Sequence, residues 1–130
     1  MAVSKKTVSV PDIHPPLPIS QAVITNGFVY ISGVVGCDKT AKVVDGGIQA
    51  ESRVTLENLI KALEGAGTKL ANVVKVNIYL ANFDRDFASM NEVYVQFFGT
   101  ENPPARTCVG VAKLPLNSNV EMECVAAMPP

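Results

Sequence analysis

The sequence predicts one α+β domain, spanning residues 1–130, in which a sheet of about six strands carries two helices on one face. The length of 130 residues is that of a single ordinary domain with one hydrophobic core. Segments with the period of a strand precede, separate and follow two segments with the period of a helix. Two helices of this length can cover only one face of such a sheet. Since 48% of the residues are apolar and only 18% are charged, we expect the other face to pack against copies of the chain.

The N-terminal region is expected to form a first strand near Val8 and an extended surface connector over residues 8–18. Proline has a fixed φ and no N–H group, so a proline-rich segment forms neither a helix nor a central strand. The connector contains four prolines, namely Pro11, Pro15, Pro16 and Pro18.

A β-hairpin is predicted next, because the segments QAVIT and FVYIS flank Asn26 and Gly27. The Asn-Gly pair most readily supplies the two positive φ angles of a type I′ turn. The two flanking segments are therefore expected to pair as antiparallel strands.

The first helix is predicted over residues 47–67, with Gly65 and Gly67 placed to stop it. Its apolar side chains recur at helical spacing, at Leu56, Leu59, Ile60 and Leu63. A strand is predicted over residues 74–80, where apolar residues alternate with Lys75, Asn77 and Tyr79.

The second helix follows this strand directly. We expect Asp84 or Asp86 to cap its start and Gly99 to close it. One apolar stripe runs along it, formed by Phe87, Met90, Tyr94, Phe97 and Phe98. Two last strands are predicted over residues 105–112 and 120–128, separated by the turn-forming segment LPLNSN.

Composition excludes several classes of function. The net charge is −1, and the sequence has no run of basic residues that would favour nucleic-acid binding. No apolar stretch is long enough for a membrane span. The N-terminus lacks the features of a secretory signal, and the odd cysteine count without CxxC spacing argues against disulfides, so we expect a cytoplasmic protein, with import into mitochondria as the alternative. A paired-histidine centre is excluded because His14 is the single histidine. The chain also has no GxGxxG, P-loop or zinc-site pattern, so we expect chemistry without a metal or cofactor.

Candidate chemistry begins in the strand at residue 105, where the period of two places Arg106, Cys108 and Gly110 on one face. A guanidinium suits a ligand carboxylate, and an interchain salt bridge is the alternative reading of Arg106. A cysteine beside a cation is a candidate nucleophile, a hydrogen-bonding group or a small core residue.

Two further positions are open to more than one reading. Glu121 and Glu123 share a face of the last strand, and either is a candidate partner of Arg106 or proton acceptor for water; solvated carboxylates are the alternative. Asn91 falls on the apolar stripe of the second helix, where a hydrophobe is expected. It is either a buried structural amide or a ligand contact.

The segment PARTCVGVAKLPLNSNVEMECVA, residues 104–126, resembles the signature of the Rid family, also called the YjgF or L-PSP endoribonuclease-like family. The resemblance extends through VVKVNIYLANFDRDFASMNEVYVQFF and FVYISG and so covers nearly the whole chain. It implies a chorismate-mutase-like α+β fold with a mixed sheet, a homotrimer, and ligand clefts between subunits. It also implies hydrolysis of 2-iminobutanoate and 2-iminopropanoate to 2-keto acids and ammonia, without a cofactor.

The resemblance assigns roles to residues by their match to the family's motifs. It implies that Arg106 binds the substrate carboxylate, that Glu121 handles the attacking water, and that the cleft is lined by Cys108, Asn91 and Gly33. The chain departs from the family at Ile19, where deaminating members usually carry a tyrosine. The departure motivates one alternative, a noncatalytic carboxylate-binding module. A second alternative is the ribonuclease or translation-inhibitor activity attributed to some members, which the balanced charge and the lack of paired histidines weaken.

Overall fold

A computed structural model describes residues 4–130 of the protein. The elements follow the predicted order of strands and helices, and two single 3-10 turns lie at Leu70–Asn72 and Pro115–Asn117. The eight main elements are β1 (Lys6–Val8), β2 (Ala22–Thr25), β3 (Phe28–Val35), α1 (Gly47–Ala66), β4 (Val73–Leu80), α2 (Phe83–Phe98), β5 (Ala105–Gly110) and β6 (Val120–Ala127).

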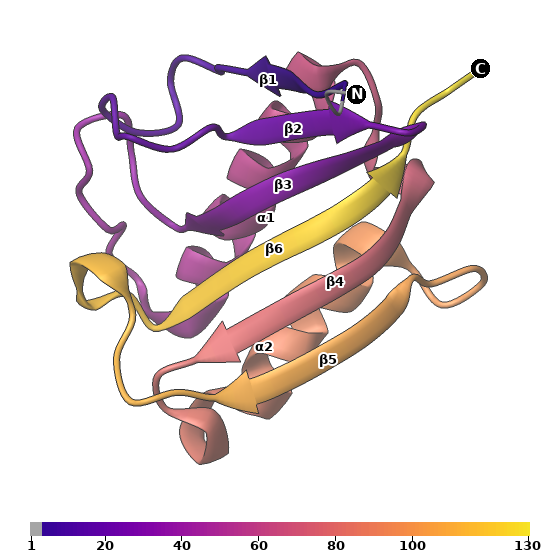
Figure 1. The fold of residues 1–130 in the computed structure, drawn as a ribbon. Coiled ribbons are helices and arrows are strands. Elements are labelled where there is room, and N and C mark those ends of the chain that lie inside the picture. The colour runs from indigo at the N-terminus through magenta and orange to yellow at the C-terminus, as the bar shows by residue number, and fades with distance from the viewer. Residues whose placement is uncertain (1–3) are drawn as a thin grey trace.

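The six strands form one mixed sheet in the order β1-β2-β3-β6-β4-β5 (Figure 1). All neighbouring pairs are antiparallel except β4 and β5, which are parallel and joined through α2. The last strand of the chain, β6, is therefore inserted at the centre, between β3 and β4. This arrangement confirms the predicted α+β class with a six-stranded mixed sheet.

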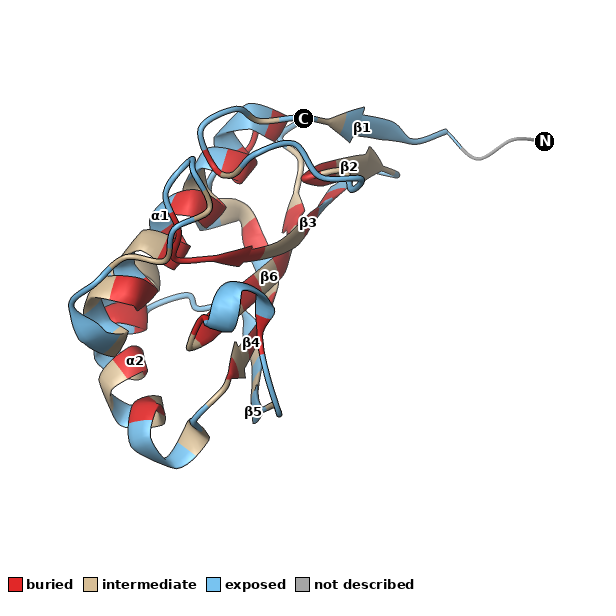
Figure 2. Ribbon diagram, turned by 90° about the vertical axis from the view of Figure 1, so that its left-hand side faces the viewer, coloured by how far each residue is buried: buried red, intermediate tan, exposed pale blue. Residues whose placement is uncertain are grey.

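Both helices pack on the same face of the sheet (Figure 2). The core lies between the helices and the sheet. It includes the fully buried side chains of Leu56, Leu59 and Leu63 of α1 and of Met90 and Val93 of α2. Among residues 4–130, no helix covers the opposite side of the sheet, here called the open face (Figure 2). Tyr30 of β3 and Val109 of β5 are exposed there, at 47% and 42% of their surface. The prediction that two helices would cover one face only is confirmed.

The predicted hairpin is present. Asn26 and Gly27 have φ angles of 51° and 80°, and Thr25 pairs with Phe28 across the turn. Both central residues have the positive φ that a type I′ turn requires.

The end of α1 corrects one prediction. The helix ends at Gly67, which has a φ of 93° and donates its N–H to Leu63 and Glu64. Gly65 does not stop the helix but lies within it, where an added Cβ would sit 2.5 Å from a methyl group of Val10. Its missing side chain lets the segment after β1 cross the helix closely.

The start of α2 corrects another. Asn82, and neither Asp84 nor Asp86, occupies the N-cap position, and it makes no side-chain capping bond. Both aspartates lie in the first turn, where carboxylates favour the positive end of the helix dipole. Asp86 is buried and forms a salt bridge with Arg85 at 2.8 Å. As predicted, the helix closes at Gly99.

The proline-rich connector is neither helix nor strand after Val8, which ends the edge strand β1. It is not wholly a surface segment, however, because Ile13 is only 1% exposed and belongs to the core.

Of the two last strands, β6 matches its predicted range closely, whereas β5 ends at Gly110. Within residues 4–130, neither helix combines the length and the hydropathy that crossing a bilayer requires.

Candidate active site

Arg106 projects from β5 toward α2. Its Nη1 donates a hydrogen bond of 2.6 Å to Oδ1 of Asn91. Asn91 lies about one turn of α2 from each of two aromatic residues, Phe87 and Tyr94. The guanidinium carbon lies 4.8 Å from the centre of the Tyr94 ring and 5.8 Å from that of Phe87. A neutral amide and two ring faces therefore hold the cation.

No carboxylate neutralises this charge in the described part of the chain, where the salt bridge found is that of Arg85 with Asp86. An anion would be a favourable further hydrogen-bond partner for a half-buried guanidinium whose acceptor is a neutral amide. Asn91, also half-buried, acts as the amide that orients Arg106.

Cys108 lies two residues along β5 on the same side as Arg106, as the period of two predicted. Gly110 also faces α2, since a Cβ added to it would lie 3.1 Å from Cβ of Phe83. Burial raises the pKa of the Cys108 thiol, and the nearby Arg106 charge opposes this only in part. The thiol form therefore prevails at neutral pH, which argues against Cys108 as a nucleophile.

Glu121 points to the open face, because its neighbours Val120 and Met122 are fully buried on the helix side of β6. It packs against Gly33, where a Cβ would stand only 2.6 Å from a carboxylate oxygen of Glu121. Burial, and next the charge of Glu123, raise the pKa of the Glu121 carboxyl above its usual value. A carboxylate with a raised pKa is better matched to proton transfer near neutral pH.

The structure does not support Glu121 or Glu123 as a partner of Arg106 within one chain. Both glutamates share the open face, whereas Arg106 contacts α2 on the helix face. Glu123 instead accepts a hydrogen bond from the hydroxyl of Tyr79, which with burial raises the pKa of that tyrosine to about 12.

A cavity of about 340 Å³ opens beside Glu121 and Gly33. Leu17 of the connector and Ile19 just after it line the cavity on one side, and Leu116 lines it from the turn before β6. Three of the residues assigned by the family resemblance, Ile19, Gly33 and Glu121, thus lie around one space.

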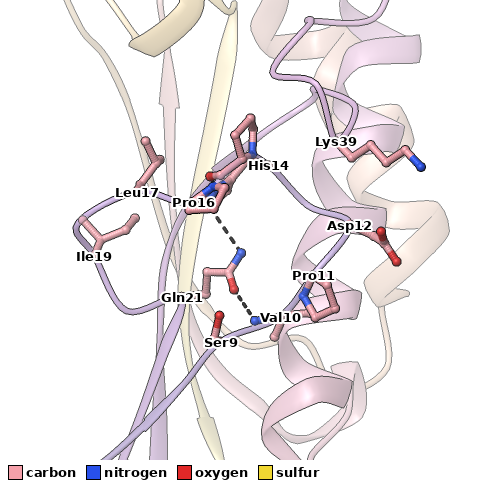
Figure 3. A pocket seen from close by; sticks show the side chains of 11 residues that line it. Ser9, Val10, Pro11, Asp12, His14, Pro16, Leu17, Ile19, Gln21 and Lys39 are labelled. Carbon is pink, nitrogen blue, oxygen red and sulfur yellow. Dashed lines mark hydrogen bonds between the residues drawn. The ribbon is translucent and has the colours of Figure 1, made fainter.

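The connector is held in place by Gln21, which is 8% exposed and lies at the start of the hairpin (Figure 3). Its side-chain oxygen accepts the N–H of Val10, so its amide nitrogen faces His14 and donates to Nε2 of that ring at 3.3 Å. Nδ1 of His14 lies 2.7 Å from the carbonyl oxygen of Pro15, to which it donates. These bonds fix the course of the chain between β1 and Ile19.

The start of β6 is held by Glu51 of α1, which is only 2% exposed. Its carboxylate accepts the backbone N–H of Asn119 at 2.6 Å, the side-chain amide of Asn119 at 2.9 Å and the N–H of Val120 at 3.2 Å. A buried carboxylate thus fixes the backbone immediately before Glu121.

The predicted site residues therefore fall into two groups in one chain. Arg106, Cys108 and Asn91 lie between β5 and α2, and the other three surround the cavity beside Glu121. Sequence patterns alone do not predict Tyr94, Leu17 or Leu116 as site residues. Tyr94 belongs to the apolar stripe of the second helix, and no pattern distinguishes its ring from the core.

The family model described as Endoribonuclease L-PSP matches residues 12–128. The chain belongs to the Rid family, in which L-PSP endoribonuclease-like proteins are grouped. The resemblance noted in the sequence is thereby confirmed, and it covers both groups of predicted site residues.

Rid proteins that carry other names are similar to this chain over most of their length. A 2-iminobutanoate/2-iminopropanoate deaminase of Dermatophagoides farinae is 40% identical over 127 residues, covering 95% of this chain and 97% of that protein. The mitochondrial protein MMF1 of Saccharomyces cerevisiae is 43% identical over 107 residues, covering 82% and 72%. The crystal structure of yeast Mmf1 matches with a TM-score of 0.91 at 38% identity, covering 97% of this chain and all of that one.

A further Rid structure was solved with a small molecule. The Escherichia coli protein TdcF with bound serine matches with a TM-score of 0.86 at 29% identity, covering 95% of this chain and 99% of that one. Among these Rid proteins, one therefore carries a deaminase name and another was solved with a bound amino acid.

Proposed function

We propose that this Rid protein hydrolyses small 2-imino acids, such as 2-iminobutanoate and 2-iminopropanoate, to 2-keto acids and ammonia. The observation that carries the proposal is Arg106, a half-buried cation whose partner in the described chain is the neutral side chain of Asn91. The deaminase name of the mite relative and the serine bound to TdcF, which carries a carboxylate, support the same substrate class.

Arg106 binds the substrate carboxylate in this proposal. Asn91 engages one nitrogen and the Tyr94 ring supports the guanidinium plane, so the remaining N–H groups are oriented for two parallel hydrogen bonds to a carboxylate. Fixing the carboxylate in this way lowers the entropic cost of presenting the imine carbon to water.

Glu121 accepts a proton from the attacking water. As the water oxygen bonds to the imine carbon, the electrons of the C=N double bond move to nitrogen, which takes up the proton that Glu121 received. The hydroxyl proton of the resulting carbinolamine then transfers to the amine nitrogen as the C–N bond breaks, so ammonia leaves and the oxygen becomes the keto oxygen. The raised pKa of Glu121 suits it to this work, and the missing side chain at Gly33 leaves its carboxylate room. Cys108 lines the cleft as a thiol and takes no covalent part.

The site is completed by two copies of the chain in this proposal. Arg106 and Glu121 lie on opposite faces of one sheet, so one subunit provides Arg106, Asn91 and Cys108 and its neighbour provides Glu121 and the cavity beside it. A homotrimer packed through the open faces supplies such pairs, and the exposure of Tyr30 and Val109 there supports the packing.

Ile19 favours a second candidate, a noncatalytic module that binds small carboxylates. The usual tyrosine hydroxyl is absent there, and a lost hydrogen bond is worth about 0.5 to 1.5 kcal/mol, which is enough to weaken catalysis. Ribonuclease activity, named in the family description, gains no support from the site, because the chain's single histidine is engaged with Gln21 and Pro15.

The proposal is tested by generating 2-iminobutanoate with a threonine dehydratase and following keto acid release. We expect wild type to accelerate release and Arg106→Ala to abolish the acceleration. An inactive wild type that still binds 2-oxobutanoate in calorimetry would replace the deaminase with the binding module. Rescue of such an inactive protein by Ile19→Tyr would locate the cause at that hydroxyl.

We also propose a cytoplasmic location, on the basis of three free cysteines, Cys37, Cys108 and Cys124, which a reducing compartment maintains. The mitochondrial name of the yeast relative makes mitochondria the competing compartment. Fractionation of cells that produce the full chain distinguishes the two.

A further inference from the structure

The cavity beside Glu121 has an apolar wall that a substrate as small as 2-iminopropanoate does not require. Leu17, Ile19 and Leu116 reach this wall from two separate segments and are 54%, 52% and 50% exposed. Large apolar side chains that gather around one hollow while remaining exposed mark a binding surface. Figure 3 shows Leu17 and Ile19 side by side on the connector.

The backbone at Leu116 is strained. This residue has a φ of 59° and a ψ of 19°, in the left-handed region that is unfavourable for a residue with a Cβ. The turn is held by Ser118, whose N–H and hydroxyl both donate to the carbonyl of Pro115, at 3.0 and 2.8 Å. Strain maintained by surrounding bonds is typical of positions that serve binding, and here it accompanies the placement of Leu116 at the cavity.

The charge around the cavity indicates which part of a ligand enters. Glu121 is the one carboxylate among the described lining residues, and it would repel a carboxylate. His14 also lines the cavity, but both of its ring nitrogens are engaged, by Pro15 and Gln21. The side chain of an imino acid therefore occupies the cavity, while its carboxylate points away toward Arg106 of a neighbouring copy. The volume of about 340 Å³ is that of a small-molecule site and is too small for a folded partner.

We infer that Leu17, Ile19 and Leu116 form a side-chain pocket that selects 2-imino acids with branched aliphatic side chains, such as those derived from valine and leucine. This inference rests on the proposed function and adds the preferred substrate to it. Ile19, which removes a hydroxyl from the family's usual site, extends the apolar wall. Each methylene group buried in such a pocket improves binding roughly fourfold.

The imine of leucine has three more carbons than that of alanine, and the pocket walls are half-exposed. We therefore expect kcat/KM to be at least about tenfold higher for the leucine imine. The imines are generated from the two amino acids by an amino acid oxidase, and keto acid release is corrected for spontaneous hydrolysis.

Two variants and a control locate the preference. Leu116→Asn keeps a residue that tolerates the left-handed backbone but makes the wall polar, and Ile19→Ser removes the apolar surface of the connector. Both should reduce the ratio of the two kcat/KM values toward one. Val95→Ser, on the exposed side of α2 with 45% exposure, should leave the ratio unchanged. A wild-type ratio near one, or a ratio unaffected by Leu116→Asn and Ile19→Ser, overturns the inference.

A binding measurement separates failure of the pocket from failure of the enzyme. If neither imine is hydrolysed faster than in buffer, the proposed function fails, and calorimetry with the two keto acids then decides the pocket alone. Tighter binding of 4-methyl-2-oxopentanoate than of 2-oxopropanoate, by at least about tenfold, supports the pocket, and equal binding overturns it. If Leu116→Asn changes the mass of the assembly but not this ratio, the apolar wall packs against a second copy and the inference is wrong.

Discussion

Arg106 and Glu121 project from opposite faces of the same sheet. Arg106 contacts Asn91 and Tyr94 of α2, whereas Glu121 lies against Gly33 on the face without helices. Strands β6, β4 and β5 pair side by side, so the sheet itself separates the two groups. Any reaction that needs both residues requires two copies of the chain.

Mixing two inactive variants tests this requirement. Arg106→Ala and Glu121→Gln are each expected to lack activity as pure proteins. In an oligomer with random exchange, about one quarter of the interfaces combine an intact Arg106 with an intact Glu121, so about one quarter of the wild-type rate should return. The mixture is assayed after refolding together, with separately refolded samples as the control. A mixture that stays inactive despite confirmed exchange contradicts the shared site.

Glu121→Gln is expected to stabilise the protein at neutral pH while it abolishes activity. The folded pKa of Glu121 is raised, so between the unfolded and the folded pKa the folded state binds more protons than the unfolded state. The free energy of unfolding therefore decreases as pH rises through this window, and the variant lacks that decrease. Urea unfolding at several pH values and one protein concentration measures the difference. The exposed Glu57→Gln should retain the wild-type pH dependence, and an unchanged profile in Glu121→Gln counts against the burial argument.

The pH dependence of activity should respond to Glu123. Its charge contributes to the raised pKa of Glu121, after burial. In Glu123→Gln the pKa of Glu121 is lower, so the acidic limb of kcat/KM should shift to lower pH. A shift to higher pH would show that Glu123 acts through another group.

Glu51→Ala should lower the free energy of unfolding by about 2 to 4 kcal/mol, because the buried N–H groups of Asn119 and Val120 lose their acceptor. Glu51→Gln retains a carbonyl oxygen and should lose less. Chemical denaturation measures both, and Glu57→Ala on the exposed side of α1 should stay within about 0.5 kcal/mol of wild type. Equal effects at Glu51 and Glu57 would contradict the role of the buried carboxylate.

Ile13 of the connector and Ile19 just after it should differ sharply in their contribution to stability. Ile13→Ala is expected to cost about 2 to 4 kcal/mol because Ile13 is 1% exposed in the core. Ile19→Ala, at a position 52% exposed, should cost less than about 0.5 kcal/mol. Thermal unfolding of the two variants compares them, and similar losses would mean that the connector does not pack as described.

Tyr30→Glu should weaken the proposed homotrimer, because it places a charge on the open face at a side chain that is 47% exposed in one chain. Sedimentation should show wild type at about three times 13.8 kDa and the variant at lower mass on dilution. Val95→Glu on α2 is the matched control and should sediment as wild type. A variant that keeps the wild-type mass at every concentration removes the open face from the interface.

Local patterns were sufficient to predict most of the elements. Asn26 and Gly27 supplied the turn, and the period of two correctly placed Arg106 and Cys108 on a common side of β5. Resemblance in the segment of residues 104–126 identified the family. The errors concern features that depend on distant packing, such as Gly65, which looked like a helix stop but makes room for Val10.

The type and order of the elements, and the residues that share a side of each strand, follow from the sequence. That Arg106 faces α2 and Glu121 faces away from both helices depends instead on how the strands pair in the folded chain. Alternation along a strand defines two sides but does not say which side meets the core, and the insertion of β6 between β3 and β4 depends on pairing between distant segments. Three other features also depend on the fold: the burial of Ile13, the contact of Arg106 with the Tyr94 ring, and the cavity wall formed by Leu17 and Leu116. Each brings together residues that are neighbours in space and not in sequence.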